Sequence, residues 1–354
     1  MTDIPNTSSA PSASRRAALK IGLGAALAGL LPRQAAFGDN RLAPQQAVAL
    51  KPVADPDPIV DARFPSEIAR DVWLIPDRRI NLIPNIGIIV GKKKALIVDC
   101  GLGPESGRQV LEAARRLAPG RELVLTQTHA HPEHAFGAVA LKDHVEIFLN
   151  RAQNDYLTRS GPAMLTYFRS FGPNVAHFLE GVEVVPATTT YEGAQATLDL
   201  GGRRVEFRNW GTAHSPGDQT IFLPDENILF AGDLIEERMI PIVPYLPPHI
   251  TKADINTAQW TKVLTGIEQS KPAIIVPGHG NLGRAEVARS VREWLAAVQS
   301  RVAAAAADGG VEGKVPRLMA EIQAMHPAWE FPARIEWAVN YFAPGWPGSD
   351  QKRQ

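Results

Sequence analysis

The feature that most constrains this chain is a short loop in which four side chains capable of binding a metal lie within six residues. Residues 128–134 read Thr-His-Ala-His-Pro-Glu-His, and they supply three imidazoles and one carboxylate between His129 and His134. The loop follows the apolar run Leu123–Gln127, whose composition predicts a strand. A tight turn after a strand can present all four side chains to one point, so this loop predicts a metal site.

Three more candidate ligands lie in turn-rich contexts further along the chain. They are His214 in Gly-Thr-Ala-His-Ser-Pro-Gly-Asp, Asp233 in Phe-Ala-Gly-Asp-Leu, and His279 in Pro-Gly-His-Gly. Imidazole nitrogen and carboxylate oxygen suit zinc and similar divalent ions. A single histidine is more often an ordinary loop residue, but several converging ligands favour a metal site. The whole set is large enough for two ions, and an aspartate with one oxygen for each ion suits a bridging position.

These motifs resemble those of the metallo-β-lactamase-fold superfamily over approximately residues 70–300. The first motif of that family is His-X-His-X-Asp-His, and the loop matches it with glutamate in place of aspartate. The resemblance implies two ligand sets: His129, His131 and His214 for a first metal, and Glu133, His134 and His279 for a second, with Asp233 between them. It also implies that Asp99, at the end of a predicted strand, lies next to the ligands without binding a metal.

Glu133 stands where the family usually has aspartate, so its carboxylate reaches about one methylene further, roughly 1.5 Å. From there it could bind the second ion or act as a general base toward water. We therefore take Glu133 and Asp233 as the candidate catalytic residues. We expect two divalent metal ions, with the second bound more weakly. Zinc is the expected metal, and iron and manganese are alternatives.

The resemblance implies a hydrolase in which metal-bound hydroxide attacks an ester, thioester, lactone or lactam carbonyl. The fold alone does not choose among these substrates. Asp233 is typical of thioesterase and lactonase members more than of β-lactamases. No lysine follows it closely to hold a β-lactam carboxylate, and Arg238 is the candidate substitute. The alternatives are a periplasmic β-lactamase, a mononuclear iron enzyme of the persulfide-dioxygenase type, and a non-catalytic exported accessory protein.

The N-terminus predicts export. Ser14–Lys20 contains two adjacent arginines, and the apolar run Ile21–Leu31 and a small-residue stretch follow it. This pattern is typical of a secretory signal, and the arginine pair resembles the bacterial twin-arginine signal. The apolar run is shorter than the ~20 residues that span a bilayer. We expect residues 1–38 to be a signal peptide, cleaved between Ala35 and Asn40, and the mature protein to be periplasmic without a stable membrane anchor.

Composition agrees with an enzyme that acts on small molecules. The chain has 37 basic and 37 acidic residues and a formal net charge of zero, so nothing directs it toward nucleic acid or anionic membranes. The single cysteine, Cys100, excludes an intramolecular disulfide, and its position at the end of an apolar run predicts burial. We expect a small-molecule substrate, no nucleic-acid partner, and a monomer or homodimer.

Alternation of predicted strands and helices indicates an α/β fold, and the resemblance implies a four-layer αββα sandwich of the metallo-β-lactamase type. Ile80–Val90 is among the predicted strands. The expected organisation is an irregular mature segment at 39–68, a catalytic domain at 69–308 and a helical C-terminal extension at 309–354.

A helical insertion at 150–181, with predicted helices Arg151–Thr158 and Ala163–Phe171, lies between the first and second metal motifs. Its Tyr167 and Phe168 either pack onto the core, as large apolar side chains usually do, or border the substrate. A proline-rich segment with Tyr245 follows Asp233 and forms either a pocket wall or a surface connection.

Overall fold

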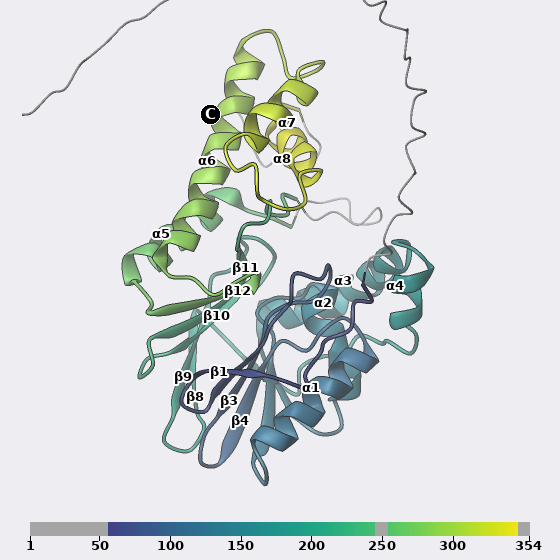
Figure 1. The fold of residues 1–354 in the computed structure, drawn as a ribbon, viewed down its shortest axis with the longest axis vertical. Helices are drawn as coiled ribbons and strands as arrows, with labels where there is room; N and C mark the ends of the chain where they lie inside the picture. The colour runs from purple at the N-terminus through teal and green to yellow at the C-terminus, as the bar shows by residue number, and fades with distance from the viewer. Residues whose placement is uncertain (1–55, 245–253, 346–354) are drawn as a thin grey trace, which may run out of the picture. The chain divides into compact units, whose positions relative to one another are not determined.

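The computed structural model of the protein describes residues 56–244 and 254–345. The predicted signal peptide, its cleavage site and Tyr245 therefore lie outside the described residues. Strands from two β-sheets lie between two sets of helices, with α1, α3 and α4 near the first sheet and α5 and α6 near the second (Figure 1).

The first sheet contains seven strands that follow one another in sequence order. They are β1 (Ser66–Ala69), β2 (Val72–Ile75), β3 (Ile86–Val90), β4 (Lys94–Val98), β5 (Glu122–Thr126), β6 (Glu146–Asn150) and β7 (Thr189–Tyr191). Strands β1 to β4 pair antiparallel, and β4 to β7 pair parallel. Because parallel strands end at the same edge of a sheet, Asp99 after β4 lies beside the histidine loop after β5.

The second sheet contains five strands in the order β12-β11-β10-β9-β8. They are β8 (Gln195–Asp199), β9 (Arg204–Asn209), β10 (Gln219–Leu223), β11 (Ile228–Glu236) and β12 (Ile274–His279). Strands β8 to β11 form antiparallel hairpins, whereas β11 and β12 are parallel. Since β11 ends at Glu236 and β12 at His279, Asp233 and His279 lie on strands.

The helices flank these sheets. They are α1 (Pro104–Leu117), α2 (Pro132–Ala135), the 3₁₀ helix η1 (Phe136–Ala140), α3 (Arg151–Arg169), α4 (Pro173–Phe178), α5 (Thr257–Ser270), α6 (Ala285–Ala307), α7 (Val315–Gln323) and α8 (Arg334–Phe342). Side chains alternate between the two faces of each strand. In β4, Ile97 therefore packs toward α1 and α3, whereas Leu96 and Val98 pack toward the second sheet. A third apolar cluster joins the second sheet to α5–α8. Three cores between four layers confirm the αββα sandwich.

Two predicted elements differ from the observed ones. Strand β3 begins only at Ile86, because residues 80–85 form a loop in which Leu82 has a positive φ of 63°. The two helices predicted in the insertion are one helix, α3, that contains Pro162. A proline removes one backbone hydrogen bond from a helix, and the buried face on either side of it, with Tyr156 and Phe168, keeps α3 continuous.

The C-terminal helices complete the third apolar cluster, which lies against the second sheet. Ile322 of α7 and Val339 and Phe342 of α8 are buried against residues of α6 such as Trp294. Figure 1 shows α7 and α8 packed beside α6. Among the residues that the structure describes, no helix is both long and apolar enough to cross a bilayer.

Candidate metal centre

The predicted ligands come together at one end of the two sheets. The loop after β5 carries His129 and His131, and α2 follows at once, with Pro132 in its first turn beside Glu133 and His134. The turn before β10 carries His214, and β11 and β12 carry the last two, Asp233 and His279. All seven residues are at most 8% exposed.

These side chains form two groups that share one residue. The ligand atoms of each group lie within 4.8 Å of one another. The groups are His129, His131, His214 and Asp233, and Glu133, His134, Asp233 and His279. This is the division that the family resemblance implies. Glu133 lies in the second group despite its longer side chain.

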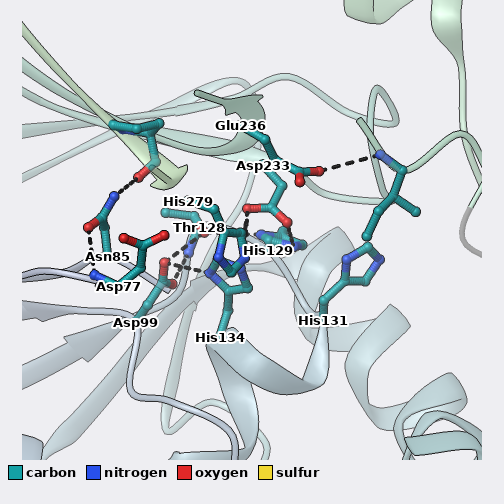
Figure 2. A network of polar contacts seen from close by, with 12 residues as sticks. Asp77, Asn85, Asp99, Thr128, His129, His131, His134, Asp233, Glu236 and His279 are labelled. Atoms are coloured by element: carbon teal, nitrogen blue, oxygen red, sulfur yellow. Dashed lines mark hydrogen bonds and ion pairs between the residues drawn. The ribbon is translucent and has the colours of Figure 1, made fainter. Parts of the chain in front are cut away.

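Asp233 lies between the groups, with one carboxylate oxygen toward each (Figure 2). Its Oδ2 is 3.7 Å from Nε2 of His129 and 3.9 Å from Nε2 of His214. Its Oδ1 is 3.2 Å from Nε2 of His134 and 3.7 Å from Nε2 of His279. A carboxylate in this position can bind one cation with each oxygen.

The unsatisfied polar atoms at this site fit the binding of cations. Buried polar groups in proteins almost always have a hydrogen-bond partner. Five buried ligand atoms here have none: Nε2 of His129, Oε2 of Glu133, Nε2 of His134, and Oδ1 and Oδ2 of Asp233. Divalent ions bound between these nitrogen and oxygen atoms would satisfy them.

Asp99 orients two of the imidazoles, as expected of a residue next to the ligands. Its carboxylate accepts hydrogen bonds from Nδ1 of His134 at 2.9 Å and from the backbone N and the Oγ1 of Thr128, at 2.7 and 2.9 Å. Because the only hydroxyl proton of Thr128 points to Asp99, its oxygen accepts from Nδ1 of His129 at 3.1 Å. Both imidazoles are thereby held with Nε2 directed at Asp233.

Other polar contacts position His214 and His279. Asp218 accepts from the backbone N of His214 at 2.6 Å and from the hydroxyl of Ser215 at 2.6 Å, which holds the turn. Nδ1 of His279 donates to the carbonyl oxygen of Ile83 at 2.9 Å, which leaves its Nε2 for a cation. The loop at residues 80–85 is therefore part of the site.

The close approach of β11 and β12 requires a residue without a side chain at Gly278. A Cβ atom at this position would lie 1.9 Å from Oδ1 of Asp233. The glycine thus allows the bridging carboxylate to lie directly against the next strand.

The electrostatics of the first group favour neutral ligands. Burial lowers the pKa of His129 and His131 well below the ordinary value, and that of His214 to about 4. Burial alone would raise the pKa of Asp233, but the surrounding imidazoles, above all His134, lower it well below its usual range. Neutral imidazoles around an ionised carboxylate are the form that binds divalent ions.

The second group holds protons in the absence of a cation. Burial opposes a charge on His134, but the carboxylates of Asp233 and Asp99 outweigh it, and the pKa of His134 is raised. Burial raises the pKa of Glu133 to about 7. A cation bound between these side chains would take the place of those protons.

The other residues named from the sequence lie as follows. Tyr167 and Phe168 line a cavity that also contains Glu133 and His279, whereas Arg238 is exposed and is not among the described lining residues. Neither ligand group among the described residues includes His144, His177 or His326, and His249 lies outside those residues. Cys100 is buried as predicted, and burial raises the pKa of its thiol well above the ordinary value.

Sequence reasoning missed several residues that hold the site together. Asp218 lies four residues after His214 in the same turn motif, and this short spacing could have indicated its contact with the turn. Asn85 donates from Nδ2 to the carbonyl oxygens of Pro277 and Gly280 on either side of His279, at 3.0 and 2.8 Å. Arg334 of the C-terminal extension lies 2.6 Å from Oε2 of Glu236 on β11. No pattern in the sequence around Arg334 predicts this contact.

The fold and the two ligand groups define a class of protein, and the comparison with known families agrees. The chain belongs to the metallo-beta-lactamase superfamily, whose family model matches residues 79–279, more than half of its length. It is a metal-dependent hydrolase of that superfamily.

Particular relatives share the fold and parts of the sequence. The chain is 27% identical to the acyl-coenzyme A thioesterase MBLAC2 of Gallus gallus over 57% of its own length and 74% of that protein. It is 27% identical to the metallo-beta-lactamase type 2 of Bacteroides fragilis, but over only 27% of its own length and 37% of that protein. A metallo-beta-lactamase from Pontibacter korlensis has a similar fold, with a TM-score of 0.50 and 18% identity, over 65% of this chain and 98% of that one.

Proposed function

We propose that this protein is a two-metal hydrolase of carbonyl substrates. His129, His131 and His214 would hold one divalent ion, and Glu133, His134 and His279 the other. The observation that carries the proposal is the position of Asp233, whose two oxygens face the two histidine groups separately. Zinc suits this set of nitrogen and oxygen ligands.

Two bound divalent ions would polarise a carbonyl oxygen and lower the pKa of water at the site. The chain itself contributes the fixed orientation of the ligands. Asp99 and Thr128 hold His134 and His129 with their Nε2 atoms toward Asp233. The burial of all these side chains excludes bulk water, which strengthens every electrostatic interaction with a developing oxyanion.

Esters, thioesters and lactones are the proposed substrates, in preference to β-lactams. Arg238, the candidate partner of a β-lactam carboxylate, is not among the described residues that line the cavity beside His279. A thioesterase and a β-lactamase are both among the relatives, so a substrate panel must include both kinds of bond.

Metal analysis of purified variants tests the two-metal proposal. We expect two metal ions per chain in the zinc-loaded protein and one in Glu133→Gln, which removes a ligand from the second group alone. His177→Ala is the matched control, because its side chain is 66% exposed and belongs to neither group. A constant ratio of one metal per chain in the unmodified protein, unchanged in excess zinc, would contradict the proposal.

A substrate panel tests the reaction. The metal-loaded protein should hydrolyse p-nitrophenyl esters, thioesters or lactones, and His214→Ala should abolish this activity. Hydrolysis of nitrocefin alone would identify a β-lactamase instead. Oxygen uptake by iron-loaded protein with a persulfide substrate would identify a dioxygenase, and no turnover of any substrate would favour an accessory protein.

We also propose that the protein is exported to the periplasm through the twin-arginine pathway. The adjacent Arg15 and Arg16 before the apolar run Ile21–Leu31 support this proposal. Expression of the full chain in a bacterial host should yield a periplasmic product whose N-terminus begins between residues 36 and 40. Replacement of both arginines by lysine should keep the full-length chain in the cytoplasm, and unchanged export would contradict the proposal.

A further inference from the structure

The second ligand group opens into a large cavity. The cavity has a volume of about 540 Å³, and Glu133 and His279 are among its lining residues. Pockets that hold small-molecule ligands have volumes of ~300–1,000 Å³. A substrate in this cavity would therefore lie next to the proposed reacting centre.

Two walls of the cavity come from the sandwich itself. Tyr167 and Phe168 on the last turn of α3 and Phe171 in the turn after it form an aromatic cluster, with ring centroids 4.9 Å apart between Tyr167 and Phe171 and 4.8 Å between Phe168 and Phe171. Ile80 and Leu82, from the loop between β2 and β3, also line the cavity. Apart from Arg79 and Asn81 next to Ile80, these walls are apolar.

The C-terminal extension provides a further wall. Phe331, Ala333 and Trp337, from α8 and the segment just before it, line the cavity together with Met239 and Ile242 from the segment after β11. Residues of the extension are thus next to the metal ligands, although more than 50 positions separate Trp337 from His279 in the sequence.

The arginines on the cavity wall are already paired with carboxylates. Arg79 Nε is 2.7 Å from Oε1 of Glu330, and its Nη1 is 3.1 Å from Oε2 of Glu237. Arg334 Nη1 is 2.6 Å from Oε2 of Glu236. Among the described lining residues these are the only arginine or lysine side chains. The carboxylates neutralise the charges of both arginines, so the lining favours an uncharged occupant.

Two large apolar side chains on the cavity wall are open to solvent. Phe171 is 45% exposed and Trp337 is 44% exposed. Exposed apolar side chains that gather around a hollow are typical of binding sites. An apolar ligand would remove both rings from water.

We propose that this cavity binds the uncharged, apolar acyl group of the substrate, and that Phe171 and Trp337 determine the preferred length of that group. The inference rests on the proposed hydrolase function and adds the class of substrate: esters or thioesters of acyl chains longer than acetyl.

A series of p-nitrophenyl esters from acetate to octanoate tests the inference, because only the acyl chain changes along it. Each methylene that enters the cavity should raise kcat/KM by about fourfold. A kcat/KM that stays flat or falls from acetate to octanoate would overturn the inference.

Substitutions in the cavity wall should change how kcat/KM depends on acyl chain length, with little effect on kcat/KM for the acetate. Phe171→Ala and Trp337→Ala should each lower kcat/KM for the octanoate about tenfold and leave that for the acetate within about twofold. Ala333→Trp should fill the cavity and remove the preference for long chains. Phe64→Ala is the control, because Phe64 is 72% exposed and does not line the cavity. An equal decrease in kcat/KM for every ester of the series would overturn the inference.

A binding measurement separates this inference from the proposed function. The ketone 2-decanone resembles an apolar ester but is not hydrolysed, and calorimetry should show about tenfold weaker binding to Trp337→Ala than to the unmodified protein. If the protein binds 2-decanone in this way but hydrolyses no ester, the hydrolase proposal fails and the cavity assignment stands. A dimer that Trp337→Ala dissociates, with an unchanged ester profile, would make the two aromatic side chains a subunit contact and overturn the inference.

Discussion

Nη1 of Arg334 lies 2.6 Å from Oε2 of Glu236, so helix α8 is bonded to the strand that carries Asp233. The same nitrogen donates to the carbonyl oxygen of Ile240 at 3.0 Å. Glu236 is only 1% exposed. The C-terminal extension therefore fixes the end of β11 as well as lining the cavity beside the ligands.

Removal of the positive charge of Arg334 from this ion pair should destabilise the protein. Arg334→Met leaves the buried carboxylate of Glu236 without its cationic partner, which costs about 3–5 kcal/mol. Urea unfolding measures the loss, and the double variant with Glu236→Gln should recover much of it. Arg317→Met is the control, because Arg317 is 76% exposed and pairs with Glu321 at the surface, where such pairs contribute ~1 kcal/mol or less. Equal effects of Arg334→Met and Arg317→Met would show that the buried pair is unimportant.

Asp99→Asn should weaken metal binding without removing a ligand. An amide oxygen could replace Oδ2, which accepts from His134 and from the Thr128 hydroxyl, but its NH2 group would then face the backbone N–H of Thr128 that now donates to Oδ1 at 2.7 Å. Loss of such a contact typically lowers metal affinity about 10–100-fold. Competition with a chromophoric chelator measures the affinity, and Asp143→Asn, at an exposed position, is the control. Unchanged affinity in Asp99→Asn would mean that the imidazoles are oriented by packing alone.

Gly278→Ala should disrupt the centre, because the added Cβ would meet Oδ1 of Asp233 at 1.9 Å. We expect loss of bound metal and destabilisation of about 1–3 kcal/mol or more from overpacking. The matched control is Gly266→Ala within α5, where a Cβ has no neighbour within 4 Å. That substitution should stabilise the helix by about 0.5–1 kcal/mol. Thermal unfolding and metal analysis of both variants check the contrast.

Chelation should lower the melting temperature. Bound cations would satisfy the atoms of His129, Glu133, His134 and Asp233 that lack a hydrogen-bond partner, and a ligand at one hundred times its Kd stabilises a protein by about 2.7 kcal/mol. For a domain of this size that corresponds to roughly 5 °C or more. Calorimetry after dialysis against EDTA measures the shift, and zinc should restore it. An identical melting temperature with and without chelator would contradict the expectation.

The order of predicted elements agrees with the structure where the local pattern is strong. The apolar run before His129 forms β5, as its composition predicts. The strand predicted over Ile80–Val90 was wrong in its first half, because an apolar run can line a cavity as well as form a strand. The sequence predicts two helices, Arg151–Thr158 and Ala163–Phe171, but tertiary packing keeps α3 continuous through Pro162.

The sequence alone determined which side chains could bind metal and in what order they occur, because ligand chemistry and turn residues are local properties of the chain. Only the tertiary structure decided that Asp233 directs one oxygen to each histidine group, since that depends on how β11 lies against α2 and β12. It also decided that Trp337 and Arg334 of the C-terminal extension lie at the site. Contacts between residues so far apart in the chain arise from the packing of whole layers, and no local sequence pattern predicts them.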